Sequence, residues 1–174
     1  MATQWLSLAD IPVHGREFSF TDQSIWTAPL DEFGFGYRIT HPFRASLQVL
    51  PQKKGFLLQG RIQGGLTLPC DRCAEPGQVE VDESFQVYEE LPEEKDEKEE
   101  ELLHRTGEHY ELNVSALIWE QFLLALPTKI LCTPQCRGIC PVCGRNLNID
   151  PCECEREKGD SRLSVLRNLK INHH

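Results

Sequence analysis

The sequence predicts an α+β fold in which an antiparallel β meander is covered by one main helix and followed by a cysteine-rich, zinc-binding segment. Apolar residues alternate over much of residues 42–88, whereas those in residues 113–126 repeat with helical spacing. Six of the eight cysteines lie within residues 131–155. We therefore expect a β-rich core with its packing helix over residues 1–126. The zinc segment and a short C-terminal helix would occupy residues 127–174.

The alternating region predicts about four strands. The inward face of the first would carry Phe43, Ala45, Leu47 and Val49. A second and a third strand lie on either side of Gly64-Gly65, which we expect to break the chain. Glu83 falls on the apolar face of the fourth strand, which predicts a β-bulge or a position at the sheet edge.

The first forty residues give weaker signals. A short edge strand before Pro12 and an alternating segment at residues 17–22 are indicated. Trp26, Phe33 and Phe35 are expected to pack against the core or its edge rather than to stack on bases.

Residues 113–126 predict the main helix. Asn113 is a suitable N-cap, and Pro127 ends the pattern. The predicted apolar stripe comprises Val114, Leu117, Ile118, Phe122, Leu124 and Ala125. Such a stripe indicates a helix that packs on the sheet, and we expect Trp119 to pack there too.

The charge of the chain bears on its partners. The net charge is −9, and residues 89–101 alone hold nine acids and two lysines. We expect an acidic loop over about residues 89–107. Because nucleic-acid binding relies on Lys and Arg at phosphates, a basic protein partner fits this charge better, although a local RNA-binding patch stays open. One basic candidate for partner binding lies on a predicted helix at residues 160–170 and comprises Arg162, Arg167 and Lys170.

The cysteines predict metal sites rather than disulfides. The sequence shows neither a secretory signal nor a long apolar run, which indicates a cytoplasmic protein without a membrane association. Cysteines there are more often metal ligands. The predicted zinc ligands form four close pairs: Cys70 and Cys73, Cys132 and Cys136, Cys140 and Cys143, and Cys152 and Cys154.

Two groupings of these pairs are possible. In the first, the last two pairs form a local site, and Cys132 and Cys136 share a second zinc ion with Cys70 and Cys73. In the second, the C-terminal six cysteines hold one ion with two spare thiols, and Cys70 and Cys73 stay free or share a different ion. We favour the first grouping, with two structural ions, because it leaves no exposed thiolate to oxidise.

No catalytic constellation accompanies the cysteines. A zinc site with four thiolate ligands is closed, whereas catalysis needs an open coordination position. The chain also has no phosphate-binding glycine loop and no nucleophile–base pattern. We therefore expect a protein that is not an enzyme and has no small-molecule substrate.

Several stretches of the chain resemble the YceD family of large ribosomal RNA subunit accumulation proteins. They are residues 68–76 around Cys70 and Cys73, residues 136–148, Cys152 to Cys154, the helix ending at residues 124–127, and residues 160–166. This resemblance implies a role in accumulation or assembly of the large ribosomal subunit, without a known catalytic activity.

Together these observations predict a non-enzymatic zinc protein that assists large-subunit RNA accumulation by binding a basic ribosomal protein or precursor rRNA. One alternative is a thiol redox sensor that uses the Cys-x-x-Cys pairs. Another is a zinc-ribbon regulator that binds nucleic acid, which would need a basic face that the sequence does not reveal.

Overall fold

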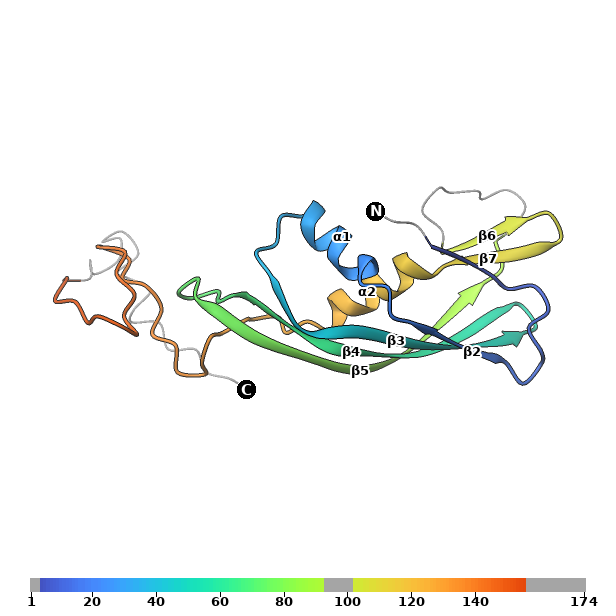
Figure 1. Cartoon of the computed structure of the whole chain (residues 1–174), viewed down its shortest axis with the longest axis horizontal. Helices are drawn as coiled ribbons and strands as arrows, with labels where there is room; N and C mark the ends of the chain where they lie inside the picture. The colour runs from blue at the N-terminus through green and yellow to red at the C-terminus, as the bar shows by residue number, and fades with distance from the viewer. Residues whose placement is uncertain (1–3, 93–101, 156–174) are drawn as a thin grey trace, which may run out of the picture.

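The computed structural model describes residues 4–92 and 102–155. Its elements are β1 (Trp5–Ser7), β2 (Arg16–Phe20), α1 (Ser24–Glu32), β3 (Arg38–Gln52), β4 (Gly55–Pro69), β5 (Pro76–Glu90), β6 (Leu103–Thr106), β7 (His109–Asn113) and α2 (Val114–Ala125). Both helices lie on the same side of a long, curved sheet, and the cysteine-rich segment extends beyond one end of it (Figure 1). The predicted α+β fold class is confirmed.

The main sheet has four antiparallel strands in the order β2-β3-β4-β5. The meander is confirmed, but the expected break at Gly64-Gly65 is wrong, because β4 runs without interruption from Gly55 to Pro69. The glycine at position 64 serves close packing, since a Cβ there would collide with the Phe43 ring. Two of the predicted strands are therefore one strand of fifteen residues.

The fourth predicted strand corresponds to β5, which is an edge of this sheet. Its pairing with β4 continues through Glu83, opposite Ile62, without a register shift. Of the two expectations for Glu83, the bulge is wrong and the edge position is confirmed. A carboxylate is tolerated on this face because the strand is not covered on its outer side.

The inward face of the sheet carries the core. Phe43, Ala45, Leu47 and Val49 are all buried, as their alternation predicts. Trp26 on α1 stacks against Phe43 with ring centroids 5.4 Å apart, and Phe122 on α2 meets the same ring edge-on at 5.2 Å. These contacts fix both helices on the sheet.

Helix α1 was not predicted from the sequence, and its position depends on a distant backbone contact. The Gln23 side chain donates to the Phe43 carbonyl (2.8 Å) and accepts from the Phe43 N–H (2.9 Å). Phe43 lies where the β3–β4 register shifts, between His41 and Arg44. The Gln23 amide therefore hydrogen-bonds with backbone groups at an irregular part of the sheet.

A second sheet of three antiparallel strands, in the order β1-β7-β6, lies at the opposite end from the cysteines (Figure 1). Strand β1 matches the edge strand expected before Pro12. Strands β6 and β7 were not predicted. Strands β5 and β6 extend into both ends of the range expected to be an acidic loop.

Helix α2 matches the predicted helix closely. The Asn113 side chain caps it by accepting from the Ala116 N–H (3.1 Å). Trp119 is buried, as expected. The predicted apolar stripe is wrong at Leu124, which is 72% exposed, because this turn of α2 lies over the sheet edge rather than its centre.

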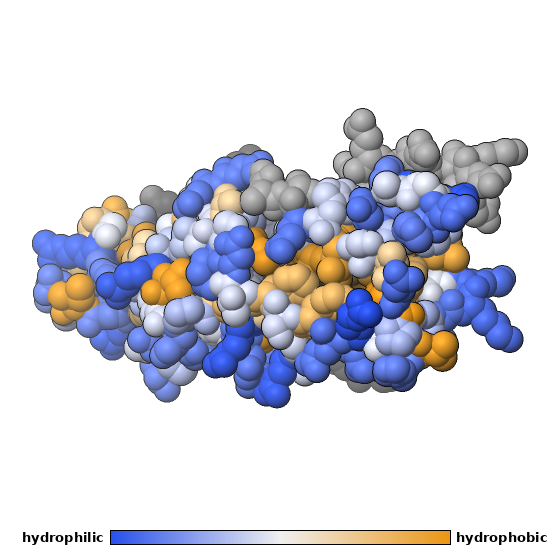
Figure 2. Space-filling view, turned by 45° about the vertical axis from the view of Figure 1, so that its right-hand side comes forward, coloured by the Kyte–Doolittle hydropathy of each residue, from blue (hydrophilic) through white to orange (hydrophobic). Residues whose placement is uncertain are grey.

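The predicted helix at residues 160–170 lies outside the described residues. In the described ranges, no helix has the length and apolar content needed to cross a membrane. In a space-filling view, apolar residues gather in the middle of one face and hydrophilic residues surround them (Figure 2).

Candidate metal centre

The structure brings the eight cysteines together in two groups of four. The proximal cluster consists of Cys70, Cys73, Cys132 and Cys136, and the distal cluster of Cys140, Cys143, Cys152 and Cys154. Within each cluster the four Sγ atoms lie within 4.8 Å of one another, and all eight cysteines are free thiols. The thiols are therefore brought together as in the first predicted grouping and not as in the second. That each cluster holds a zinc ion stays a prediction.

The turn between β4 and β5 supplies half of the proximal cluster. Cys70 follows the last residue of β4, and the turn closes through the Ala74 N–H, which donates to the Cys70 carbonyl (2.8 Å). Ala74 takes a left-handed conformation with φ +62°, and the Cys70 N–H donates to the Glu75 carbonyl (2.8 Å). The tight turn places both thiols on one side, as a metal knuckle requires.

The segment that follows α2 supplies the other half. Asp71 makes two hydrogen bonds with Ile130: its N–H donates to the Ile130 carbonyl (2.8 Å), and its Oδ2 accepts from the Ile130 N–H (2.6 Å). Arg72 Nη1 donates to the Cys136 carbonyl (2.7 Å). The returning chain is thus fixed to the β4–β5 turn by hydrogen bonds as well as by the thiols.

The distal cluster is built almost entirely from local sequence. The Cys140 N–H donates to the Arg145 carbonyl (2.8 Å), and the Gly144 N–H donates to the Cys140 carbonyl (2.9 Å). Gly144 has φ +71°, a conformation that favours glycine. The Val142 N–H points at the Cys140 Sγ (3.4 Å). This is the geometry of a second knuckle.

Asn148 connects the two clusters. Its side-chain Nδ2 donates to the Cys136 Sγ of the proximal cluster (3.3 Å), and its Oδ1 accepts from the Arg137 N–H (2.7 Å). Yet Asn148 lies in the loop between Cys143 and Cys152, within the distal cluster's own sequence. Nothing in the local pattern singles out this asparagine, so sequence reasoning did not identify it.

The thiol positions fit a tetrahedral metal ion. For metal–sulfur bonds of about 2.3 Å, neighbouring sulfurs should lie roughly 3.8 Å apart. The Cys70 and Cys136 Sγ atoms are 3.7 Å apart, and those of Cys73 and Cys132 are 3.5 Å apart. The distal Sγ atoms also lie within 4.8 Å of one another, so both clusters are able to hold a metal ion.

The electrostatics of the proximal cluster also favour a cation. Burial acts to raise the pKa of Cys70, but hydrogen bonds from Arg72 and neighbouring cysteines outweigh it and lower this pKa to about 6. Burial and the surrounding thiols raise the pKa of Cys73 to about 12. Because one thiolate suppresses ionisation of the next, a bound cation is what permits all four thiols to ionise together.

The remaining predicted site residues, Arg162, Arg167 and Lys170, lie outside the described residues. The two clusters are the groups of His, Cys, Asp or Glu side chains that have metal-ligand geometry in the described parts of the chain. Their histidine-free composition agrees with closed, four-thiol sites.

Comparisons with known proteins place the chain in a family. The model of the large ribosomal RNA subunit accumulation protein YceD matches residues 58–170, which include all eight cysteines. No solved structure matches the chain at a significant level.

Two curated plant proteins are similar to the chain. The chloroplastic large ribosomal RNA subunit accumulation protein YCED homolog 1 of Arabidopsis thaliana is 30% identical over 156 residues, covering 74% of this chain and 49% of the relative. The Zea mays protein of the same name is 26% identical over 195 residues, covering 94% of this chain and 65% of the relative. The chain spans about half to two thirds of the length of these relatives. The family match over most of the chain shows that it belongs to the YceD family of large ribosomal RNA subunit accumulation proteins.

Proposed function

We propose that the chain is a non-enzymatic, cytoplasmic zinc protein that assists the accumulation or assembly of large-subunit ribosomal RNA, by binding a basic ribosomal protein or precursor rRNA. The observation that carries this proposal is the family match over residues 58–170, which contains both cysteine clusters. The two plant relatives are also named for large ribosomal RNA subunit accumulation.

Zinc is the metal we propose for both clusters. Four thiolates in tetrahedral positions are typical of structural zinc sites, and they leave no open coordination position for a substrate or an activated water. The metal would hold the β4–β5 turn, the segment after α2 and the distal loop in one arrangement. The surface so formed, rather than a reaction at the metal, would serve the function.

A basic protein is the first partner we propose. The net charge of −9 would repel the phosphates of RNA, and each zinc ion on four thiolates would leave its site with two further negative charges. Ribosomal proteins bind rRNA through Lys and Arg side chains. An acidic surface can bind the same side chains before the ribosomal protein meets its rRNA.

The burial of the first cysteine pair argues against a redox sensor built on it. Cys70 is 4% exposed and Cys73 is 7% exposed, whereas a redox-sensing thiol needs access to its oxidant. A zinc-ribbon regulator would need a basic groove-binding face. The longest described edge strand, β5, has five acids and no Lys or Arg.

Affinity purification tests the proposal. The tagged full chain, expressed at native level, should recover basic large-subunit proteins or precursor large-subunit rRNA, and depletion of the chain should lower large-subunit rRNA relative to small-subunit rRNA. A purification that recovers neither, together with an unchanged rRNA ratio, would refute it. Metal analysis of the purified chain should find two zinc ions.

A further inference from the structure

Strand β5 presents a long unpaired edge. It runs for fifteen residues and pairs only with β4, and no other strand in residues 4–92 and 102–155 pairs with its outer side. Proteins usually protect such edges with short strands, bulges, prolines or charges. Apart from Pro76 at its first position, the protection that the described residues give β5 is its charge. The strand is therefore able to accept a further strand, provided that the newcomer tolerates its charge.

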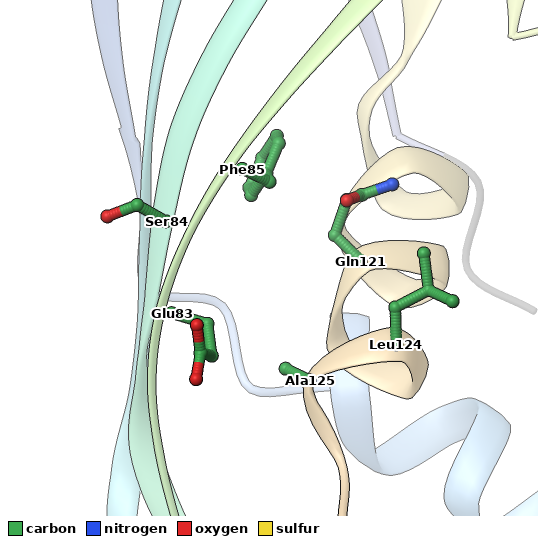
Figure 3. Close-up of a pocket in the computed structure, with 6 residues that line it drawn as sticks. All are labelled: Glu83, Ser84, Phe85, Gln121, Leu124 and Ala125. Carbon is green, nitrogen blue, oxygen red and sulfur yellow. The ribbon is translucent and has the colours of Figure 1, made fainter.

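A pocket of about 280 Å³ lies beneath this edge, between β5 and α2. Figure 3 shows Phe85 and Glu83 projecting from β5 toward α2, with Leu124 and Ala125 on the helix side. The Leu124 side chain is 72% exposed, so its apolar surface is not covered by the described residues. The volume is just below the range of small-molecule pockets, roughly 300–1,000 Å³, and suits one or two aliphatic side chains.

The charge of this region has one sign. Strand β5 carries five acids and no Lys or Arg. Residues 76–101, which include the acidic run after β5, have a net charge of −10, so the rest of the chain carries +1 of the total of −9. The net negative charge of the protein therefore comes entirely from β5 and the run that follows it.

Part of this charge has no cationic partner among the described residues. Arg61 already pairs with Asp82 (2.6 Å), but the structure gives neither Glu83 nor Glu89 a Lys or Arg partner within the described ranges. Glu89 instead lies near Glu120 of α2: burial, followed by the charge of Glu120, raises the Glu89 pKa. A Lys or Arg placed between the helix and the strand would relieve this repulsion.

We propose that the outer edge of β5 and the pocket beneath it bind an extended, Lys- or Arg-rich peptide segment of a partner protein, which adds to the main sheet as a new edge strand. An apolar side chain of this segment fills the pocket against Phe85 and Leu124, and neighbouring cations meet Glu83 and Glu89. This inference rests on the proposed function and specifies how its basic protein partner is recognised.

The same charges disfavour the other occupants. Pairing of β5 with a second copy of itself would bring two strands of five acids together, and like charges across a strand pair are destabilising. RNA would place phosphates against the same carboxylates. Of these occupants, only a basic strand can make backbone hydrogen bonds to the β5 edge, place a side chain in the pocket and pair its cations with the carboxylates.

The test measures binding of a defined peptide to the full zinc-loaded chain by fluorescence anisotropy. The probe is a labelled ten-residue peptide that alternates lysine with valine and has leucine at its centre. We expect saturable binding that weakens with salt, and amide hydrogen exchange that slows in β5. An otherwise identical peptide with glutamate in place of lysine should not bind.

Two N-methylated forms of the basic peptide test strand addition directly. Each carries methyl groups on alternate backbone nitrogens, so that one form blocks the amides on one edge and the other form those on the opposite edge. If the peptide adds to β5, one form should lose at least about tenfold in affinity and the other should retain binding. Equal binding of both forms would refute strand addition.

Matched variants locate the site. Glu83→Lys and Leu124→Lys, both at exposed positions, should each weaken binding by about tenfold or more. The controls are Glu17→Lys, on the opposite edge strand β2, and Val13→Lys, which is 90% exposed; both should bind as the parent chain does. Circular dichroism and zinc content should be unchanged in all four variants.

The remaining outcomes all count against the surface. In the first, the basic peptide fails to bind, or the control variants lose as much peptide affinity as Glu83→Lys and Leu124→Lys. In the second, the β5 amides already exchange slowly with solvent in the free monomer, or the chain dimerises through β5. In the last, the chain binds a single-stranded RNA 20-mer, and Glu83→Lys abolishes that binding. If Glu83→Lys and Leu124→Lys still recover ribosomal proteins or rRNA from cells, this surface is refuted while the proposed function stands. If the parent chain recovers neither, the proposed function fails instead.

Discussion

The two cysteine clusters have the same ligand set but differ in what they join. The proximal cluster connects the β4–β5 turn to the segment after α2, with Cys73 and Cys132 separated by 59 residues. The distal cluster closes a loop between Cys143 and Cys152 that lies wholly outside the sheets. Cys70, Cys73 and Cys136 are buried, whereas Cys143 is exposed.

The same set of four thiols can therefore stabilise the whole fold or only one loop. In the chain-entropy description of a cross-link, closing a loop of about 60 residues is worth roughly 4 kcal/mol, and a loop of about 10 residues nearer 2.6 kcal/mol. Only the proximal cross-link constrains the body of the protein. We expect the distal loop to open without disturbing the sheet, because its cross-link closes only local sequence.

Single substitutions at two half-buried cysteines, one in each cluster, should separate these roles. Cys132 and Cys152 are both half-buried, so replacing either with serine removes one ligand with a similar burial cost. We expect Cys132→Ser to lower the free energy of unfolding of the body by roughly 4 kcal/mol, and Cys152→Ser by less than about 1 kcal/mol. Guanidinium unfolding followed by tryptophan fluorescence reports on the body, because Trp26 and Trp119 are buried there.

Zinc content provides the control for this comparison. Each variant should retain one of the two proposed ions, since each has one intact cluster. Equal destabilisation by the two substitutions would contradict a special role of the proximal cluster. Loss of both ions from Cys152→Ser would show that the clusters are one cooperative unit.

A chelator should remove the two metal ions at different rates. The exposed Cys143 and the half-buried Cys152 and Cys154 let a chelator reach the distal ion, whereas three of the four proximal thiols are buried. We expect the distal ion to leave at least about tenfold faster, through local opening. Native mass spectrometry should detect a one-zinc species, and alkylation of that species should label Cys143, Cys152 and Cys154 first.

Denatured protein is the control for chelation. In guanidinium the two ions should leave at indistinguishable rates, because the difference in burial is gone. Release of the proximal ion first from the folded chain would mean that the sheet does not protect it.

The sequence predicted the four cysteine pairs because close cysteine spacing is typical of a metal knuckle. The grouping of Cys70 and Cys73 with Cys132 and Cys136 came instead from the argument that no thiolate should be left exposed. The sequence also predicted α2, whose cap at Asn113 and stop at Pro127 are local signals. The long strand β4 was misread as two, because Gly64-Gly65 has the composition of a break but serves close packing against Phe43.

The elements that were missed depend on distant partners. Helix α1 is nine residues long, contains Pro29, and is held by Trp26 against Phe43 and by Gln23 against the β3 backbone. Strand β7 pairs with β1, more than a hundred residues earlier. The pocket between β5 and α2 also arises only when the two elements pack. No short window of sequence contains these contacts.

A substitution at Asn148 should test whether the distal loop affects metal binding at the proximal cluster. It lies in the distal loop, yet its Nδ2 donates to the Cys136 Sγ at 3.3 Å. Asn148→Asp replaces this donor with a carboxylate while keeping an oxygen to accept from the Arg137 N–H. Outer hydrogen-bond partners of metal ligands typically change metal affinity by about 10- to 100-fold, so we expect a loss of that size at the proximal site.

Competition with a chromophoric chelator, with the two sites resolved by native mass spectrometry, measures this effect. Gln135→Ala is the matched control, because Gln135 is an exposed neighbour of Cys136, and this substitution should leave both affinities unchanged. A weakened proximal site in Asn148→Asp would mean that the distal loop stabilises the proximal cluster as well as itself. If only the distal ion were weakened, the clusters would be independent, and the Asn148–Cys136 hydrogen bond would contribute nothing to metal binding.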